Sequence, residues 1–359
     1  MEATRSQEGP TPTELFGRKM TDVLNHAALA LMVSIGHRTG LFDAMAELPP
    51  ATSAGVASAS GLDERYVREW LGAMVVGGVV LYDPETDLYR LPDEHAAWLT
   101  RSTMLVNAAA SAQWIGLLGG VEGLVVDAFR HGRGVPYSAY HRFHEVMAEE
   151  SSQTVVSALL EHILPLAPGL LDRLEQGVDA LDVGCGAGRA LLLMAEAFPD
   201  SRFVGRDLSE EAVALARVEA DRRGLANVRF EVRDAAEPAG RGAFDLVTAF
   251  DAIHDQARPA DVLRGVFEAL RPGGVFLMQD ISGSGRLHRD KEHPFGTFLY
   301  AVSCMHCMSV SLANGGPGLG AMWGRIKAEE MLREAGFGCV AVRESLHDPL
   351  NFYYVCNRD

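Results

Sequence analysis

The chain has 359 residues and a formal net charge of −16, from 48 acidic and 32 basic side chains. Its length predicts two domains, and its 48% hydrophobic and 22% charged residues are ordinary for a soluble globular protein. Because so acidic a chain gains no attraction to phosphates from counterion release, the charge argues against unspecific binding to nucleic acid.

Residues 1–13 mix charged and polar residues with glycine and proline, and contain no apolar run. We expect this segment to be disordered, and it has the features of neither a signal peptide nor an anchor. The apolar stretches elsewhere are interrupted before they reach the roughly 18 to 20 residues of a membrane span, so no membrane partner is expected. Five cysteines, an odd number, predict no disulfide framework and favour a reducing cytoplasm.

Residues 14–103 have the pattern of a small, mainly helical domain. Helices are expected over residues 24–37, 40–48, 53–60 and 63–76. Asp63 is a candidate N-cap for the last of them. Two short strands, 79–82 and 88–91, flank a turn-rich segment and are typical of a β-hairpin. Helices followed by such a hairpin predict a winged helix.

A winged helix can bind DNA or join subunits, and the charges here favour the second use. The recognition helix would be residues 63–76, whose polar face carries equal numbers of each sign: Glu64, Arg65, Arg68 and Glu69. Such a face attracts duplex phosphate only weakly. A DNA-binding regulator stays open as the alternative.

Residues 104–176 look helical and link the two domains. The segment opens with an apolar run that includes Trp114, which is typical of a buried core or a subunit interface. Residues 132–144 then combine a Gly-Pro loop with five aromatic or imidazole side chains: Tyr137, Tyr140, His141, Phe143 and His144. These side chains either form a pocket wall or pack inward at the start of a helix.

An apolar strand over residues 180–183 leads into three glycines, Gly184, Gly186 and Gly188, and then into a helix-forming run. Glycine is needed where φ is positive, or where a ligand approaches more closely than a Cβ allows. In the dinucleotide fingerprint the third glycine follows the second by three residues, whereas here it follows by two. The spacing therefore favours an adenosyl ligand without a pyrophosphate over NAD.

Further strands are expected over residues 203–207, 228–234, 244–250, 274–280, 339–343 and 351–356. Asp207 ends the first of these and is suited to accept both hydroxyls of a ribose. Asp234 ends the next and is suited to accept from an adenine amino group. Because the carboxyl ends of parallel strands meet at one edge of a sheet, we expect these residues to form one site.

Together, the segments LDVGCGAGR, VGRDLS, VRD, FDLVTAFDAIHD and LRPGGVFL resemble the class I S-adenosylmethionine-dependent methyltransferases, from about residue 178 to the end. With the winged helix in front, the chain is similar to the small-molecule O-methyltransferases of plants and actinobacteria. The resemblance implies an α/β domain over residues 177–359, with a Rossmann-like, doubly wound, mostly parallel seven-stranded sheet. It also implies S-adenosylmethionine as cofactor, and a homodimer joined through the winged-helix domain.

The resemblance assigns roles to residues at this sheet edge. The three glycines would cradle the methionine and adenosine moieties, with Asp182 near the methionine amino group. The remaining cofactor contacts would come from Asp207 at the ribose, Asp234 at the adenine amino group and Phe250 along the cofactor, with Leu208 and Ala235 as further cofactor-binding residues.

The segment Asp251-Ala-Ile-His254-Asp255-Gln256 resembles the His-Asp segment in which a histidine of these enzymes deprotonates the acceptor hydroxyl. A histidine suits this role because its pKa lies near neutrality. We expect His254 to be the general base, with Asp255 as a second catalytic residue and either Asp251 or Asp255 orienting the ring. Since Gln256 replaces the tryptophan usual in the family, a capping or cofactor-shell role for His254 stays open.

Before a helix expected over residues 327–335, an aromatic and sulfur-rich segment contributes Phe295, His306 and Trp323 to the predicted acceptor pocket. Cys304 and Cys307 form a lone C-x-x-C motif, and because no second pair of ligands follows, we expect no metal site. A Met- and Cys-rich helix along an apolar pocket is the simpler interpretation, with methylation of arsenite as an outside alternative.

The sequence thus predicts methyl transfer from S-adenosylmethionine to a hydroxyl group of a small, partly aromatic or otherwise apolar metabolite. Methylation of carbon or nitrogen is one alternative, since an acidic carbon or an amine needs no histidine base. A winged-helix regulator that only senses S-adenosylmethionine is the other.

Overall fold

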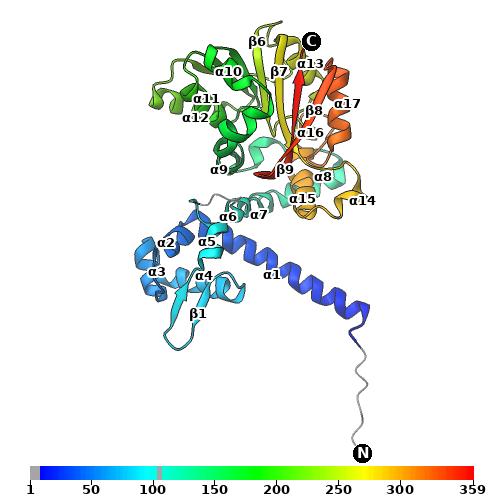
Figure 1. The fold of residues 1–359 in the computed structure, drawn as a ribbon. Helices are drawn as coiled ribbons and strands as arrows, with labels where there is room; N and C mark the ends of the chain where they lie inside the picture. Colours follow the sequence, from blue (N-terminus) through cyan, green and yellow to red (C-terminus); the bar gives the residue numbers. More distant parts are fainter. Residues whose placement is uncertain (1–8, 103–106) are drawn as a thin grey trace, which may run out of the picture. The chain divides into compact units, whose positions relative to one another are not determined.

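The computed structural model describes residues 9–102 and 107–359 (Figure 1). The chain divides into two compact units, Met1–Gly116 and Leu117–Asp359. This division falls within the predicted linker, residues 104–176. Residues 1–8, for which disorder was predicted, lie outside the described residues. The first residues of the predicted linker, 104–106, also lie outside them.

The first unit consists of helices and one β-hairpin. Its helices are α1 (Pro12–Arg38), α2 (Leu41–Glu47), α3 (Ser53–Ser60), α4 (Glu64–Val76), α5 (Asp93–Leu99) and α6 (Ala108–Ser111). Strands β1 (Leu81–Asp83) and β2 (Leu88–Arg90) pair antiparallel. Helix α7 (Gln113–Gly119) spans the boundary between the units. The predicted helices and hairpin are confirmed, although α1 begins at Pro12, inside the segment predicted to be disordered.

The core of the first unit is organised around Trp70. Its ring meets that of Phe42 edge-on, with 5.3 Å between centroids. The indole N–H donates to the carbonyl of Met32 at 2.8 Å, so the polar atom is satisfied inside the core. Asp63 caps α4 as predicted, because its carboxylate accepts from the backbone N–H groups of Arg65 and Tyr66.

The second unit is built on a seven-stranded sheet in the order β5-β4-β3-β6-β7-β9-β8. Its strands are β3 (Asp179–Val183), β4 (Arg202–Asp207), β5 (Val228–Val232), β6 (Phe244–Phe250), β7 (Leu270–Ile281), β8 (Cys339–Ser345) and β9 (Asp348–Asn357). Neighbouring strands are parallel, except that β9 is antiparallel to both β7 and β8. The predicted α/β class and mostly parallel sheet are confirmed.

Helices and short helical turns connect these strands. The α-helices are α8 (Glu122–His131), α9 (Phe143–Thr154), α10 (Leu170–Gln176), α11 (Arg189–Ala197), α12 (Glu210–Arg223), α13 (Pro259–Ala269), α14 (Leu287–Asp290), α15 (Gly296–Val302), α16 (Met308–Ala313) and α17 (Arg325–Ala335). The 3-10 turns are Tyr137–Ala139, Val156–Ala158 and Leu164–Leu166. Two segments, Leu159–Ile163 and Ser303–Cys307, are π-helical.

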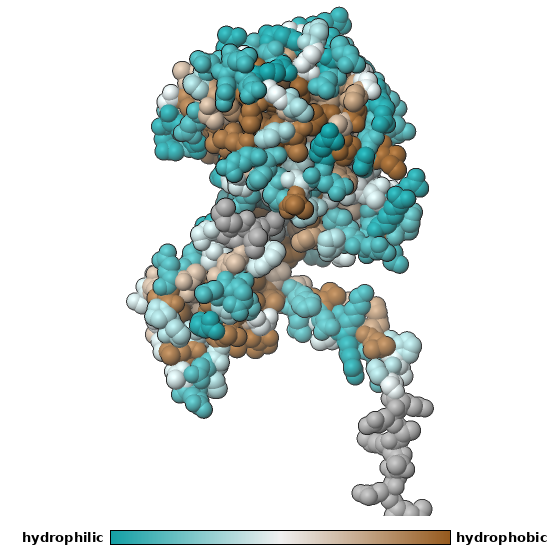
Figure 2. Space-filling view, viewed as in Figure 1, coloured by the Kyte–Doolittle hydropathy of each residue, from teal (hydrophilic) through white to brown (hydrophobic). Residues whose placement is uncertain are grey.

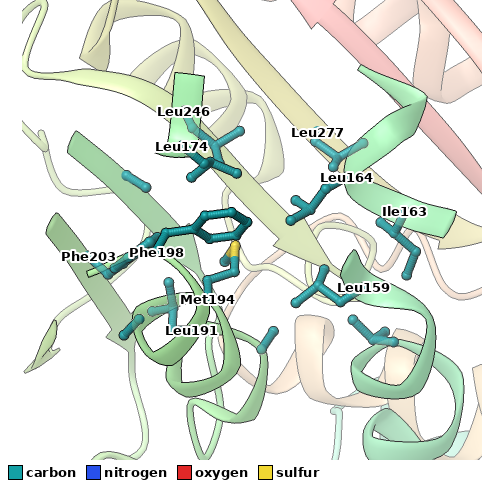
Figure 3. Close-up of a cluster of buried hydrophobic side chains, with 14 of the residues drawn as sticks. Leu159, Ile163, Leu164, Leu174, Leu191, Met194, Phe198, Phe203, Leu246 and Leu277 are labelled. Carbon is teal, nitrogen blue, oxygen red and sulfur yellow. The ribbon is translucent and has the colours of Figure 1, made fainter. Parts of the chain in front are cut away.

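Alternating strand residues supply one hydrophobic core on each face of the sheet. On one face, Leu246 and Leu277 pack against residues from α11 and from the helical stretch 159–174 (Figure 3). On the other face, Phe276 and Met278 pack with residues of α13 and α17. The sheet is therefore covered on both faces, as a mostly parallel sheet requires.

The stretch Gly296–Ala313 is long and apolar enough to cross a membrane by length and composition, and two bent helix pairs pass the same test. Two serines of this stretch hydrogen-bond within the second unit. Ser309 Oγ accepts from the backbone N–H of Val135 at 2.9 Å, and Ser311 Oγ donates to the carbonyl of Gln256 at 2.8 Å. These contacts favour an interior helix of the domain.

The strand order reverses next to β3. From β3 the chain continues to β4 and β5 on one side, and then to β6 and β7 on the other. In open α/β sheets, ligands bind beyond the carboxyl ends of the strands at such a switch point. The predicted site residues follow these strand ends.

Candidate active site

The three glycines of the predicted turn connect β3 to α11, and all three have positive φ angles, of 72°, 52° and 71°. A Cβ on Gly184 would lie 2.5 Å from Ala252, and one on Gly188 would lie 2.4 Å from the ring of Phe230. Packing therefore requires glycine at both positions. A Cβ on Gly186 would meet nothing within 4 Å, so this backbone borders open space where a ligand can lie against it.

Asp182, in β3, is 3% exposed, and its Oδ1 accepts a hydrogen bond of 2.7 Å from the Thr248 hydroxyl. Burial raises the pKa of Asp182 to about 7; the bond from Thr248 lowers this pKa and the charge of Asp207 raises it further. A buried carboxylate held by a neutral hydroxyl gains stability when a cation binds beside it. Asp182 therefore fits the ammonium group that the resemblance places here.

Asp207, the last residue of β4, holds the glycine turn in place. Its Oδ2 accepts from the backbone N–H of Gly186, and its Oδ1 from that of Ser209, both at 2.8 Å. The predicted ribose anchor thus lies directly beside the open glycine, and each oxygen retains capacity for a second hydrogen bond. Its neighbour Leu208 is exposed.

Asp234 lies two residues beyond the end of β5, although the strand was predicted to reach it. Its Oδ1 accepts from the backbone N–H of Ala236 at 2.8 Å, a side-chain turn that ends the extended run. Its Oδ2 accepts from Arg258 at 2.7 Å. Arg258 is absent from the predicted site, because no sequence pattern links two residues 24 positions apart. Ala235 and Phe250 pack against the edges of the two cores.

His254 lies in the turn after β6 and is 3% exposed. Its Nδ1 is 2.9 Å from Oδ1 of Asp280, in β7. The same oxygen accepts from the indole N–H of Trp323 at 3.0 Å and from the backbone N–H of Ile281 at 2.8 Å. Asp280, rather than the expected Asp251 or Asp255, orients the ring, because β6 and β7 are paired neighbours whose carboxyl ends lie together.

Two neighbours, Asp280 and Cys307, control the protonation of His254. Burial alone lowers its pKa, but Asp280 and the Cys307 thiol outweigh burial and raise the pKa well above the usual 6.5. With Nδ1 facing a carboxylate, the neutral imidazole carries its proton on Nδ1 and keeps Nε2 as the basic atom. The pair therefore has the protonation pattern of a general base and its orienting carboxylate.

Asp255, the second predicted catalytic residue, has a different partner. The Tyr137 hydroxyl donates to its Oδ2. Burial raises the pKa of Asp255; His254 and Tyr137 lower this pKa, whereas Asp280 and Asp207 raise it. Asp255 is thus electrostatically coupled to both the ribose anchor and the His254 pair.

Two predicted pocket residues, Tyr137 and Tyr140, meet a third, His306, together with Phe143. Phe143 stacks on the His306 ring at 4.4 Å between centroids, and Tyr137 and Tyr140 approach the ring edge-on. Burial, helped by the charges of two neighbouring histidines, lowers the pKa of His306 to about 3. This aromatic wall therefore presents a neutral imidazole at physiological pH.

The other predicted acceptor residues lie in different surroundings. His144 Nε2 contacts the Ser209 hydroxyl at 2.9 Å, next to the ribose anchor. Trp323 is buried and supports Asp280. His141 and Phe295 are exposed, and Trp114 belongs to the first unit. A substrate contact from any of them stays a prediction.

Asp251, His254 and Asp280 together could hold a metal ion, since their candidate ligand atoms lie within 4.8 Å of one another. The 2.9 Å between His254 Nδ1 and Asp280 Oδ1 is, however, a hydrogen-bond distance. A metal would need a deprotonated Nδ1, and it would compete for an oxygen that already accepts from Trp323 and Ile281. The geometry favours a hydrogen-bonded His-Asp pair.

Comparisons with known proteins agree with this architecture. Residues 27–101 match an Rv2258c-like winged HTH domain, and residues 174–336 match a methyltransferase domain. Nocamycin O-methyltransferase of Saccharothrix syringae is 44% identical over 94 residues, which make up 25% of this chain and 34% of that protein. Erythromycin 3''-O-methyltransferase of Saccharopolyspora erythraea is 34% identical over 136 residues, 37% of this chain and 41% of that protein.

The chain thus spans 34% and 41% of the lengths of these two relatives. Solved structures match nearly the whole chain. Human N-acetylserotonin methyltransferase in complex with SAM has a TM-score of 0.67 and 17% identity, covering 100% of this chain and 99% of that one. Mitomycin 7-O-methyltransferase has a TM-score of 0.65 and 17% identity, and the match covers 96% of this chain and 98% of that one. At these identities the likeness shows the fold alone.

Proposed function

Because the chain carries a methyltransferase domain behind a winged helix-turn-helix domain, we propose that it transfers a methyl group from S-adenosylmethionine to a hydroxyl group of a small molecule. The observation that carries the proposal is the buried 2.9 Å hydrogen bond between His254 and Asp280. His254 follows β6, which pairs with β3, the strand that leads into the glycine turn, and Asp280 lies in β7, the next strand of the sheet. A donor site and a base therefore share one sheet edge.

The residues at the glycine turn fit the methyl donor. Asp182 offers a buried carboxylate for its ammonium group, Asp207 has remaining acceptor capacity for the ribose hydroxyls, and Gly186 leaves room for close approach. When bound, S-adenosylmethionine supplies an electrophilic methyl group on a sulfonium centre. The chain's own contribution is to hold that group and the acceptor in line.

His254 acts on the acceptor. Its Nε2 takes the proton from the hydroxyl, while Asp280 stabilises the imidazolium that forms. Trp323 and the backbone of Ile281 fix Asp280 in turn, so the ring is held in one orientation. Holding the oxygen about 3 to 3.5 Å from the methyl carbon provides much of the acceleration.

We also propose that the winged-helix domain joins two copies of the chain and does not bind DNA. The basic residues of α4 pair along the helix, Arg65 with Glu69 at 2.5 Å and Arg68 with Glu64 at 2.8 Å, and are thereby drawn away from phosphate. Helix α1 exposes large apolar side chains: Leu15, Phe16, Met20, Val23, Leu24, Leu31 and Ile35. Figure 2 shows hydrophobic and hydrophilic residues side by side on the surface of the first unit. Burying these side chains against a second copy of the chain would remove apolar surface from water, which favours association.

The dimer has a direct test. Light scattering should give twice the chain mass for the wild type and the chain mass for Leu24→Glu, which places a charge on the apolar face of α1. A monomeric wild type would contradict the dimer, as would a Leu24→Glu variant that stays dimeric. All five cysteines are free, which supports our proposal of a cytoplasmic location.

The function is tested by screening hydroxyl-bearing compounds with S-adenosylmethionine and measuring release of S-adenosylhomocysteine. An acceptor found in this way should be methylated at least ~100-fold more slowly by His254→Gln, since general base catalysis contributes that much. The affinity for S-adenosylhomocysteine should be unchanged. Equal rates in the two proteins would remove His254 as the base, and failure of the wild type to bind S-adenosylhomocysteine would remove the donor.

A further inference from the structure

Three aspartates, Asp251, Asp255 and Asp280, surround His254 at the ends of β6 and β7. Each has one buried carboxylate oxygen without a hydrogen-bond partner in the described part of the chain: Oδ1 of Asp251, Oδ1 of Asp255 and Oδ2 of Asp280. Asp280 is completely buried. Buried carboxylate oxygens are costly unless a donor or a cation meets them, so these oxygens indicate a ligand that supplies one.

Two of the three aspartates already have a role. Asp280 orients His254. Asp255 accepts from the hydroxyl of Tyr137, in the aromatic wall. Asp251 has no role in the mechanism described above.

Asp251 is held in an unusual way. Its φ of 54° is left-handed, which is uncommon for any residue other than glycine. Its backbone N–H donates to the carbonyl of Gln279 at 3.0 Å, and its Oδ1 lies 3.7 Å from Nδ1 of His254. Uncommon backbone conformations persist where the surrounding structure enforces them, often at ligand sites. Here the conformation directs a carboxylate to the base.

Like charges approach Asp251 from two sides. Burial raises its pKa to about 7; His254 lowers this pKa, and the charges of Asp280, Glu150 and Asp255 raise it. Glu150 belongs to α9, which begins at Phe143 of the aromatic wall, whereas Asp255 follows β6 and Asp280 lies in β7. A cation bound between these groups would favour their ionised forms and relieve the repulsion.

The residues around Asp251 indicate which kind of cation could bind there. A metal ion would compete with the hydrogen bonds that already meet Oδ1 of Asp280. The ammonium group of the methyl donor is assigned to Asp182, in β3. The remaining candidate is a cationic group on the acceptor, because the acceptor hydroxyl must lie beside His254.

We propose that the methyl acceptor is an amino alcohol whose ammonium group binds Asp251 while its hydroxyl group faces His254. The inference rests on the proposed function, which places the acceptor at this histidine. Since Oδ1 of Asp251 lies 3.7 Å from Nδ1 of the same ring whose Nε2 faces the hydroxyl, the ammonium and hydroxyl groups lie on nearby carbon atoms of the acceptor. Neutral acceptors of the same shape leave the Asp251 carboxylate unpaired and bind more weakly.

Two probes of matched shape test the inference: trans-2-aminocyclohexanol, which is cationic at pH 8, and trans-cyclohexane-1,2-diol, which is neutral. Their affinities are measured calorimetrically on protein saturated with S-adenosylhomocysteine. The cationic probe should bind at least ~10-fold more tightly, the value of a charge-assisted hydrogen bond. Asp251→Asn should abolish the preference, and asparagine tolerates the left-handed backbone. Asp221→Asn, which removes an exposed carboxylate from α12, should keep it.

Several outcomes would overturn the inference. Equal affinities for the two probes, binding of neither, or a preference that survives in Asp251→Asn would each do so. A tenfold loss of S-adenosylhomocysteine affinity in Asp251→Asn would assign the residue to the cofactor. Competition between Mg²⁺ or Zn²⁺ and the cationic probe, reversed by EDTA, would assign the cluster to a metal. If the wild type fails to bind S-adenosylhomocysteine, the proposed function itself is wrong.

Discussion

The candidate site has two halves that are built differently. The cofactor half, at β3, β4 and β5, consists of a glycine turn and carboxylates that bind backbone N–H groups close to them in the fold. The acceptor half, at β6 and β7, consists of side chains that converge from distant segments, such as His254, Asp280 and Trp323.

The two halves therefore place different physical requirements on the sequence. In the cofactor half, the ligand lies against backbone, so the main constraints are φ angles and space for close approach. In the acceptor half, chemistry depends on the protonation of buried groups, so the constraints are burial and the sign of neighbouring charges. Substitutions in one half should leave the function of the other intact.

The largest effect is expected for Asp280→Asn. Without the carboxylate the imidazole loses its orientation and the stabilisation of its charge, so turnover should fall by ~10² to 10⁴-fold while the Kd for S-adenosylhomocysteine stays the same. In the wild type, kcat/KM should rise with pH through an inflection above 6.5, because only the neutral ring is a base and its pKa is raised. In Asp280→Asn that inflection should move to lower pH. An unmoved inflection would show that Asp280 does not control His254.

The next largest effect is expected in the glycine turn, where substitutions should lower the free energy of unfolding. Gly188→Ala forces a Cβ against the Phe230 ring at a φ of 71°, so the free energy of unfolding should fall by ~1 to 3 kcal/mol or more. Gly186→Ala meets no atom and should cost less stability, but it should weaken binding of S-adenosylhomocysteine. Urea unfolding and calorimetry measure the two quantities. Equal loss of stability in both variants would refute the assignment of Gly186 to ligand contact.

The two halves also differ in how far the sequence predicts them. The glycines, Asp207 and Asp234 follow single strands, so local motifs indicate both their positions and their common edge. Asp280 was seen only as a strand end, because its contact with His254 depends on the pairing of β6 with β7 across 26 residues.

The fold was predicted more completely than the site. Periodicity and glycine or proline breaks gave the helices, the hairpin and the separate strands, since these depend on neighbours along the chain, whereas the mostly parallel seven-stranded sheet was implied by the family resemblance. The contacts of Tyr137 with Asp255, and of Arg258 with Asp234, join loops that meet only after folding. Positions of this kind cannot be read from residue spacing.

A smaller effect is expected from pH in the cofactor half. Because the pKa of Asp182 is raised to about 7, its carboxyl group is protonated below that pH and must release the proton when an ammonium group binds. The Kd for S-adenosylhomocysteine should therefore rise up to ~10-fold for each pH unit below 7 and level off above it. Asp182→Asn should bind weakly with a flat profile between pH 5 and 7. A flat wild-type profile would contradict this role.

The smallest effect is expected where the halves meet. Tyr137→Phe removes the donor to Asp255 and should cost ~0.5 to 1.5 kcal/mol of unfolding free energy, with a rise in the acceptor KM. The matched control is Tyr300→Phe, whose hydroxyl donates to Asp290 at 2.8 Å and makes no contact with His254, Asp255 or Asp280 in the described part of the chain. It should cost similar stability and leave KM unchanged. Equal KM values in the two variants would remove Tyr137 from the pocket wall.

The central claim is that this sheet edge binds a methyl donor through its cofactor half alone. Calorimetric titration of S-adenosylhomocysteine into the wild type, Asp207→Asn and Asp280→Asn tests it most directly. We predict binding to the wild type and to Asp280→Asn with the same Kd, and at least ~10-fold weaker binding to Asp207→Asn, which loses a charged acceptor for the ribose. Absence of binding to the wild type, or equal weakening in both variants, would contradict the account.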